Sequence, residues 1–201
     1  MPKMDGPWFD PKDNNVVDYE QNATDLFQAL EEGQFSYADE MYKQVKGQFN
    51  SECKTWVVSR EVTKDGERKH RFRVLPLHVA LVYGAPDELI KKIMNAYPKA
   101  ARAKDSHGRL PIHLAMKYNA SEQLIWAILG AFPKGFFVKD NKGMLPLDYV
   151  SPNDNRALMK KYLPLIMDAK VEEERVKWEA EQEDPFYSCR QLPFRHLCCS
   201  E

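Results

Sequence analysis

The chain has 201 residues, and its hydrophobic content of 43 % and charged content of 29 % suit one folded domain with tails. Its net charge of −1 excludes an overall field that would draw it to nucleic acid or membrane. The local charge is uneven, because residues 51–74 hold seven Lys/Arg against four Asp/Glu, and residues 168–184 hold eight Asp/Glu against three Lys/Arg.

The ends of the chain and its cysteines suggest a location. Residues 1–8 contain no apolar stretch typical of a signal peptide, and no segment approaches the roughly 18 apolar residues of a membrane span. The spacing of Cys53, Cys189, Cys198 and Cys199 predicts no disulfide framework. We therefore expect a cytoplasmic or nuclear protein with reduced thiols.

The first part of the chain predicts a helical unit. Residues 1–21 are rich in Asp, Asn and Pro without an apolar period, so we expect a disordered lead-in. A helix is predicted to begin near Asn22 or Thr24, either of which could cap it, and to end at Gly33. A second helix is predicted from about residue 37 to residue 45, which completes a helix–turn–helix unit.

Residues 55–74 predict a β-hairpin. The run 55–62 is β-branched and aromatic, Asp65-Gly66 supplies a turn, and the run 67–74 returns. Its basic residues surround the aromatic rings of Trp56, His70 and Phe72; they are Arg60, Lys64, Arg68, Lys69, Arg71 and Arg73. This charge could contact a specific partner, but we favour a solvated strand face that protects an exposed edge.

A repeat dominates the middle of the chain. Leu75-Pro76-Leu77-His78 recurs as Leu110-Pro111-Ile112-His113 and as Leu145-Pro146-Leu147-Asp148, each time 35 residues later. The segments 75–109 and 110–144 share 15 identities in 35 positions. A constant period in this range predicts a solenoid of stacked units.

Each unit predicts two helices and a turn. Pro76 suits the first turn of a short helix, because proline lacks the N–H that would be unsatisfied there. Gly84 can end this helix, and a longer apolar-faced helix follows until Tyr97-Pro98. The segment from Asp105 to Gly108 consists of residue types that favour a turn, and we expect this turn to lead into the next unit.

The third unit departs from the pattern, as a terminal repeat is expected to do. Asp148 replaces the histidine, and Pro164 falls where the first unit has Met94. We expect the repeat domain to end at residue 163, a charged helix over 164–183, and a flexible tail over 184–201.

The pattern Asp-x-x-Gly-x-Leu-Pro-Leu-His-x-Ala, a Gly or Asn four residues after the Ala, and then Leu-Ile-x-x-Ile resembles the ankyrin repeat. The Leu-Pro-Leu-His variant preceded by a Trp-bearing hairpin is similar to an ankyrin group abundant in diatoms and related algae. The resemblance covers roughly residues 22–163. It implies an all-α repeat solenoid with a β-hairpin insertion near the N-terminal repeat and a C-terminal helix. The usual threonine before the proline is replaced by Leu75, Leu110 or Leu145.

No residue set predicts catalysis or a cofactor. His78 and His113 are equivalent positions of successive units, and the resemblance implies that they bond backbone between units. Cys53, His70 and Asp65 lack a group that would orient them as a nucleophile set. We therefore expect neither an enzyme nor a cofactor.

The C-terminal cysteines are candidate positions for a metal or a lipid. Cys189, His196, Cys198 and Cys199 do not have the spacing of a closed tetrahedral metal site, so we expect no metal. Cys198-Cys199-Ser200-Glu201 is an atypical prenylation terminus, and membrane binding is expected only if these cysteines are lipidated.

The resemblance implies an adaptor or scaffold, a monomer that binds another protein through its turn tips and its concave helix face. The turn-tip positions are Ser106, His107, Arg109, Asn141, Lys142 and Met144. The helix positions are Val82, Tyr83, Lys117 and Tyr118, with Glu31 and Glu32 equivalent in the first unit. The alternative is a regulatory protein that contacts nucleic acid or an acidic partner through the hairpin residues Arg60, Arg68 and Arg71. Of these two partners, we do not expect nucleic acid.

Overall fold

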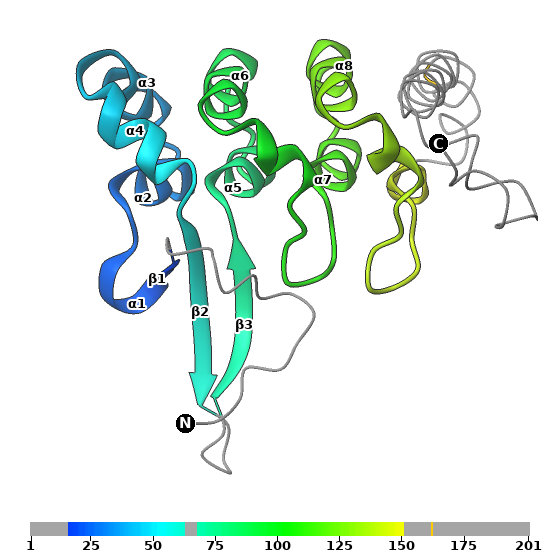
Figure 1. Ribbon diagram of the computed structural model, residues 1–201, viewed down its shortest axis with the longest axis horizontal. Helices are drawn as coiled ribbons and strands as arrows, with labels where there is room; N and C mark the ends of the chain where they lie inside the picture. The colour runs from blue at the N-terminus through cyan, green and yellow to red at the C-terminus, as the bar shows by residue number, and fades with distance from the viewer. Residues whose placement is uncertain (1–15, 63–67, 151–161, 163–201) are drawn as a thin grey trace, which may run out of the picture.

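The computed structural model describes residues 16–62, 68–150 and 162. Figure 1 shows two rows of helices stacked side by side, with a sheet and two turns projecting from one side of the stack. The lower row is α2 (Asp25–Glu31), α5 (Pro76–Val82) and α7 (Pro111–Lys117). The upper row is α3 (Phe35–Gln44), α6 (Asp87–Ala96) and α8 (Glu122–Ala131).

The remaining short helices join or extend these rows. They are α1 (Tyr19–Asn22), α4 (Lys46–Glu52), and the 3-10 helices η1 (Pro98–Arg102), η2 (Pro133–Phe137) and η3 (Pro146–Tyr149). The short helix η3 contacts α7 and so continues the lower row beyond it. The structure thus contains two full helix pairs of the 35-residue period, a related pair before them, and the start of a third unit.

The core runs along the stack between the two rows. Each lower helix buries two apolar residues four positions apart, because residues at i and i+4 share one helix face. These pairs are Leu26 and Leu30, Leu77 and Leu81, and Ile112 and Met116, all at most 3 % exposed. The upper helices contribute Leu89, Ile90 and Ile93 from α6 and Leu124, Ile125 and Ile128 from α8.

The ends of the lower helices use the residues that the sequence singles out. Thr24, one of the two predicted caps, accepts a hydrogen bond from the Phe27 N–H at 3.3 Å through its Oγ1. The chain leaves these helices through left-handed residues, Gly84 at φ 67° and Asn119 at φ 51°. Pro76 occupies the first turn of α5, where its missing N–H is tolerated.

The sheet has the order β1-β2-β3, with β1 (Val16–Asp18), β2 (Trp56–Val62) and β3 (Arg68–Val74). Strands β2 and β3 form an antiparallel hairpin, and β1 pairs in parallel with β2. Ser59 pairs with Phe72 whereas Arg60 pairs with His70, so Arg71 is the extra residue of a β-bulge. The predicted turn at 63–66 lies outside the described residues.

The structure corrects the prediction for the N-terminal part. Residues 16–21 were predicted to be disordered, but they form β1 and most of α1. Val16 and Val17 pack against the core, and the Asp18 carboxylate accepts a hydrogen bond from the Glu20 N–H at 3.1 Å. Three residues of strand are too few to predict from a local pattern when their partner lies far away in the sequence.

Helix α4 was not predicted either. Its Phe49 is fully buried, and the Glu52 carboxylate accepts a hydrogen bond from the Leu26 N–H at 2.8 Å, at the beginning of α2. The second helix begins at Phe35 and ends at Gln44, close to the predicted 37–45. The predicted helix over 164–183, the tail over 184–201 and most of the third unit lie outside the described residues.

Within the described parts of the chain, no helix is both long and apolar enough to cross a membrane.

Candidate functional site

Two exposed tyrosines mark the ends of the central lower helices. Tyr83 follows α5 and Tyr118 follows α7, and the two occupy equivalent positions of successive units. Their side chains are 48 % and 42 % exposed, whereas the repeated apolar positions of the same helices are buried. Lys117 lies beside this row with its Nζ 5.1 Å from the centroid of the Tyr118 ring, and Val82 is half-buried.

Glu31 connects this row to the first unit. Its carboxylate accepts hydrogen bonds from the Tyr19 hydroxyl at 3.1 and 3.2 Å. Burial and the nearby Glu31 carboxylate raise the pKa of both Tyr19 and Tyr83. The carboxylate of Glu31 therefore lies near both phenols, and the row extends from Tyr19 through Tyr83 to Tyr118.

Sequence reasoning missed Tyr19, because the residue was assigned to the disordered lead-in. Its ring packs edge-on against Phe27 at 5.8 Å and against Phe72 at 5.2 Å between centroids. Glu32, the equivalent of Tyr83 in the first unit, is exposed. The first unit thus offers carboxylates where the next two units offer phenol rings.

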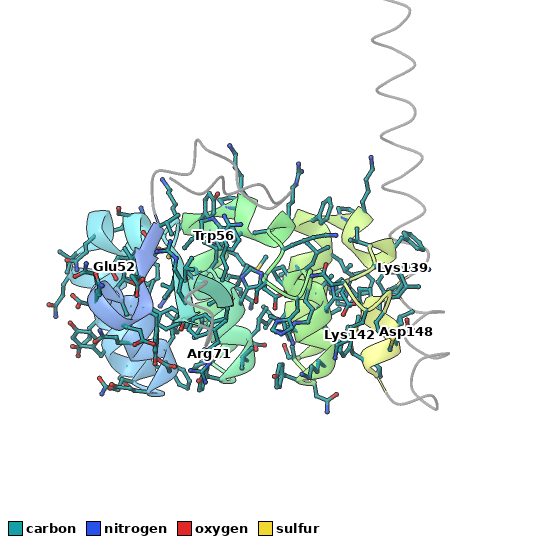
Figure 2. The ribbon with its side chains drawn as sticks, turned by 90° about the horizontal axis from the view of Figure 1, so that it is seen from below. Glu52, Trp56, Arg71, Lys139, Lys142 and Asp148 are labelled. Atoms are coloured by element: carbon teal, nitrogen blue, oxygen red, sulfur yellow. The ribbon has the colours of Figure 1, made fainter. Side chains whose placement is uncertain are left out.

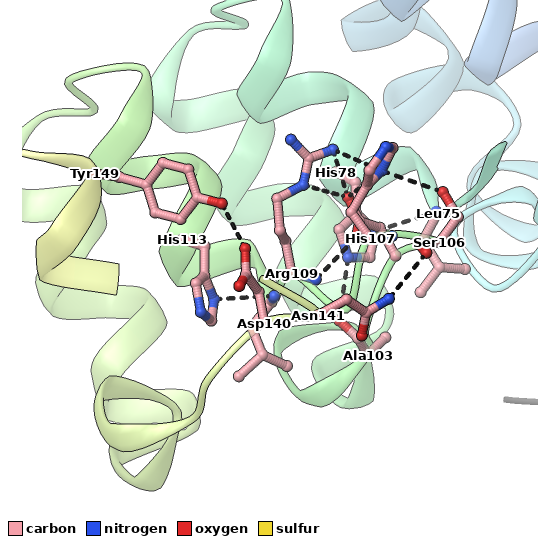
Figure 3. Close-up of polar contacts among 12 residues, drawn as sticks. Leu75, His78, Ala103, Ser106, His107, Arg109, His113, Asp140, Asn141 and Tyr149 are labelled. Atoms are coloured by element: carbon pink, nitrogen blue, oxygen red, sulfur yellow. Dashed lines mark hydrogen bonds and ion pairs between the residues drawn. The ribbon is translucent and has the colours of Figure 1, made fainter. Parts of the chain in front are cut away.

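The first turn tip is organised by Asp105, which is 3 % exposed. Its Oδ1 accepts hydrogen bonds from the backbone N–H groups of His107 and Arg109, both at 2.8 Å. The Arg109 guanidinium donates to Oδ2 from Nε at 2.8 Å and lies 2.7 Å from it through a terminal nitrogen (Figure 3). Arg109, predicted as a partner contact, therefore stabilises its own turn, while His107 is exposed and Ser106 half-buried.

The second turn tip replaces this arginine with a tyrosine. Asp140 Oδ1 accepts hydrogen bonds from the N–H groups of Lys142 at 2.8 Å and Met144 at 2.9 Å. Methionine cannot donate from its side chain, and Tyr149 supplies the missing donor to Oδ2 (Figure 3). Burial opposes ionisation of Asp140, but the hydrogen bonds from Tyr149, Met144 and Lys142 outweigh it and lower the pKa of Asp140. Burial and Asp140 in turn raise the pKa of Tyr149 to about 12.

The sheet and the two tips form one continuous edge. The Ser106 N–H donates to the Arg73 carbonyl at 3.1 Å, and the Asn141 N–H donates to the His107 carbonyl at 3.0 Å. The Asn141 side chain also donates to the Ser106 carbonyl at 3.3 Å. Of the predicted tip residues, Lys142 and Asn141 are exposed and Met144 is half-buried.

Two glycines at equivalent tip positions test this packing. Gly108 and Gly143 both adopt positive φ, 74° and 78°, so alanine at either is expected to lower the free energy of unfolding by about 1–2 kcal/mol. A Cβ at Gly108 would also meet the Asn141 side chain and lie 2.9 Å from the Asn141 backbone nitrogen, whereas one at Gly143 meets nothing within 4 Å. We expect Gly108→Ala to be more destabilising than Gly143→Ala by about a further 1–3 kcal/mol, measured by urea unfolding. Equal losses would show that the two tips separate easily.

Two of the hairpin cations, Arg60 and Arg73, contact other side chains of the fold. The Arg60 guanidinium lies 3.7 Å from the Asp18 carboxylate, and the Arg73 guanidinium stacks 3.8 Å from the centroid of Trp56. Trp56 itself is 5 % exposed and therefore belongs to the core. Arg71 is exposed at the bulge, and Figure 2 shows it at the opposite edge of the view from Trp56. The side chain of Arg68 lies outside the described part.

The repeated histidines bond backbone at the unit boundaries. His78 Nδ1 accepts a hydrogen bond from the Leu75 N–H at 3.1 Å, and its Nε2 contacts the Ala103 carbonyl at 3.1 Å (Figure 3). Leucine has no side-chain acceptor, so the imidazole alone caps this helix. His113 Nδ1 accepts from the Leu110 N–H at 3.1 Å, but its buried Nε2 has no hydrogen-bond partner among the described residues.

Asp148 takes over half of this role in the third unit, where its carboxylate accepts a hydrogen bond from the Leu145 N–H at 2.7 Å. A carboxylate has no donor for a carbonyl of a following segment. The replacement of histidine by aspartate thus keeps the hydrogen bond that caps the helix but removes the N–H that would bond a carbonyl of the following segment.

The described residues hold no group of three or more His, Cys, Asp or Glu side chains that could bind a metal. Burial raises the pKa of the Cys53 thiol to about 12, so it is a poor nucleophile. The side chains of Asp65 and His70 lie outside the described part of the chain, as do Cys189, His196, Cys198 and Cys199.

No model of a known protein family matches this chain. No curated protein gives a significant match either. Function therefore has to be argued from the residues and the geometry of the exposed row and the turn tips.

Proposed function

We propose that this chain is an ankyrin-type adaptor that binds another protein through the exposed tyrosine row and the turn tips. The observation that carries the proposal is the exposure of Tyr83 and Tyr118 at equivalent positions, directly after two helices, α5 and α7, that bury their repeated apolar side chains. Tyrosine at the centre of an exposed patch is a residue type that often dominates binding energy.

The surroundings of the row support a protein ligand. Carboxylates of Glu31 and Glu32 lie at its first-unit end, and the ammonium group of Lys117 lies beside Tyr118. Such a row offers apolar rings flanked by charges of both signs, which suits a polypeptide with mixed side chains. The turn tips add the exposed side chains of His107, Asn141 and Lys142.

Replacing both row tyrosines should weaken binding without unfolding the protein. A partner captured from native extract with the full chain is first identified and purified. We expect Tyr83→Ala with Tyr118→Ala to weaken its affinity by about tenfold or more, since a hot-spot side chain contributes about 2 kcal/mol. The melting temperature should change little, because nearly half of each ring is already exposed. Affinity is measured by calorimetry and stability by thermal unfolding.

Tyr37→Ala is the matched control, because Tyr37 is also 48 % exposed but lies on α3 in the upper row. A large loss of stability in the double variant would show that the row tyrosines belong to the core. If Arg71→Glu abolished binding and the tyrosine variants did not, the partner would be bound through the basic hairpin. The exposed bulge position of Arg71 is what favours that second candidate.

A further inference from the structure

The two segments that connect the upper helices to the turn tips carry a strongly positive charge. Residues 97–104 and 132–139 contain five basic residues and no acidic residue, in a chain whose net charge is −1. We call the five residues the basic strip: Lys99, Arg102, Lys104, Lys134 and Lys139. Four of them are exposed, and Lys104 is half-buried.

The basic strip runs along the stack. Lys99 and Lys134 are equivalent positions of successive units, as are Lys104 and Lys139, so each pair lies on the same side of the stack. Lys104 Nζ donates to the Lys139 carbonyl at 3.4 Å, which joins the two units directly.

The basic strip and the tyrosine row lie at opposite ends of the helix pairs. The Ala103 carbonyl contacts His78 in the first turn of α5, so the connecting segment lies at the N-terminal end of that helix. Tyr83 follows the C-terminal end of the same helix. A ligand on the basic strip would therefore not occupy the tyrosine row.

The acidic residues closest in sequence do not neutralise the basic strip at the surface. Asp105 and Asp140 are 3 % and 7 % exposed, and their carboxylates accept hydrogen bonds from their own turns. Excess negative charge lies elsewhere in the chain: residues 19–52 of the first unit hold seven Asp/Glu against two Lys, and residues 168–184 hold eight Asp/Glu against three Lys/Arg. Positive charge is thus concentrated along one side of the two central units.

The side chains around the basic strip indicate what kind of anion it fits. Sequence-independent binding of single-stranded nucleic acid uses exposed aromatic rings on which bases stack. Here Arg102 lies over the Phe132 ring at 5.4 Å, and Trp56 is buried beneath Arg73. Phe137, 49 % exposed between Lys134 and Lys139 in the sequence, is the one large apolar side chain of these two described segments that is exposed, so they offer no series of rings for stacked bases.

We propose that the basic strip is a second docking surface, which binds an acidic polypeptide segment with an apolar residue placed against Phe137. An extended chain advances about 3.3 Å per residue, so carboxylates every third residue would match stacked units about 10 Å apart. This docking does not depend on the function proposed for the tyrosine row.

The test uses the full chain and a fluorescent glutamate-rich peptide that carries one leucine, with binding followed by anisotropy. We expect Lys99→Glu with Lys139→Glu to weaken binding by about tenfold or more, because reversing two charges replaces attraction with repulsion. Lys99→Arg with Lys139→Arg preserves the charge and should bind as the wild type does. Affinity of the wild type should fall as salt increases.

Lys117→Glu separates this proposal from the function proposed for the tyrosine row, since it alters that row and should leave peptide binding unchanged. Thermal unfolding checks that each variant is folded. Equal peptide affinity in the wild type and in the Lys99→Glu, Lys139→Glu variant would overturn the proposal. So would tighter binding to phosphatidylserine vesicles or to a polyuridine oligonucleotide than to the peptide, because the anion would then belong to another class.

Discussion

Replacing His78 with alanine is expected to lower the free energy of unfolding by about 3–5 kcal/mol. The imidazole is 1 % exposed and bonds both the Leu75 N–H and the Ala103 carbonyl. Its removal would leave a buried donor and a half-buried acceptor unsatisfied, at about 1–3 kcal/mol each at full burial, and would open a cavity between the units. Leu75 is fully buried, so its N–H is not at the protein surface, where it could bond to solvent instead.

His113→Ala is the matched control for this effect. His113 is equally buried and accepts a hydrogen bond from the Leu110 N–H, but its Nε2 has no partner in the described part of the chain. We therefore expect its loss to be smaller than that of His78→Ala by about 1 kcal/mol, the contribution of one hydrogen bond. Urea unfolding of the two variants measures the difference. Equal losses would show that the contact between His78 and Ala103 contributes nothing.

The parts of the fold that follow from local residue types were predictable. Proline in the first turn and glycine just after the helix fix the beginning and end of α5, and proline with Asn119 in the place of the glycine does the same for α7 35 residues later. The β-branched and aromatic runs on either side of Asp65-Gly66 predicted the hairpin, and the structure has strands β2 and β3 there. The period predicted stacked units because equivalent residues must meet equivalent surroundings.

The unpredicted elements depend on contacts between distant residues. Strand β1 is three residues long, and Val16 pairs with Trp56. Helix α4 contains Gly47 and lacks an apolar period, but Phe49 fills the core and Glu52 caps a different helix. Neither partner can be identified from the residues of the element itself.

The candidate site was predictable to a similar extent. The exposure of Tyr83 and Tyr118 was predicted because the repeating apolar positions account for the core, which leaves these two outside it. The pairing of Arg109 with Asp105 was missed, although an acid and a base four residues apart across an Asp-x-x-Gly turn could have indicated it. The substitute donor Tyr149 could not be predicted, because it comes from the next unit.

The stability of the fold is expected to decrease as the pH falls below neutrality, and His78 gives the reason. Burial lowers the pKa of His78 from 6.5 to about 4. Its Nδ1 already accepts a hydrogen bond from the Leu75 N–H, so a proton on Nδ1 would place two hydrogen-bond donors face to face. Asp105 opposes this shift but does not reverse it. The folded protein thus binds this proton less readily than the unfolded chain does.

The sign and the range of the pH effect follow from that difference. Because the folded pKa is lowered, the stabilisation is complete above 6.5 and is lost as the pH falls through about 4. At about 1.4 kcal/mol per pKa unit, the free energy of unfolding should fall by about 3 kcal/mol over this range. Burial also lowers the pKa of His113, which adds a loss of the same sign.

Urea unfolding across this range tests the pH prediction, with His78→Gln as the comparison. Glutamine can accept and donate hydrogen bonds but does not titrate, so this variant should be less stable at neutral pH and lose less stability on acidification. Hydrogen bonds hold the pKa of Asp140 below its usual 3.8, so the stability that its carboxylate contributes is lost mainly below this range. If the His78→Gln variant loses as much stability on acidification as the wild type does, the acid sensitivity belongs to another group. If the wild type is equally stable at pH 6.5 and at pH 4, His78 takes up its proton without disturbing the boundary between units.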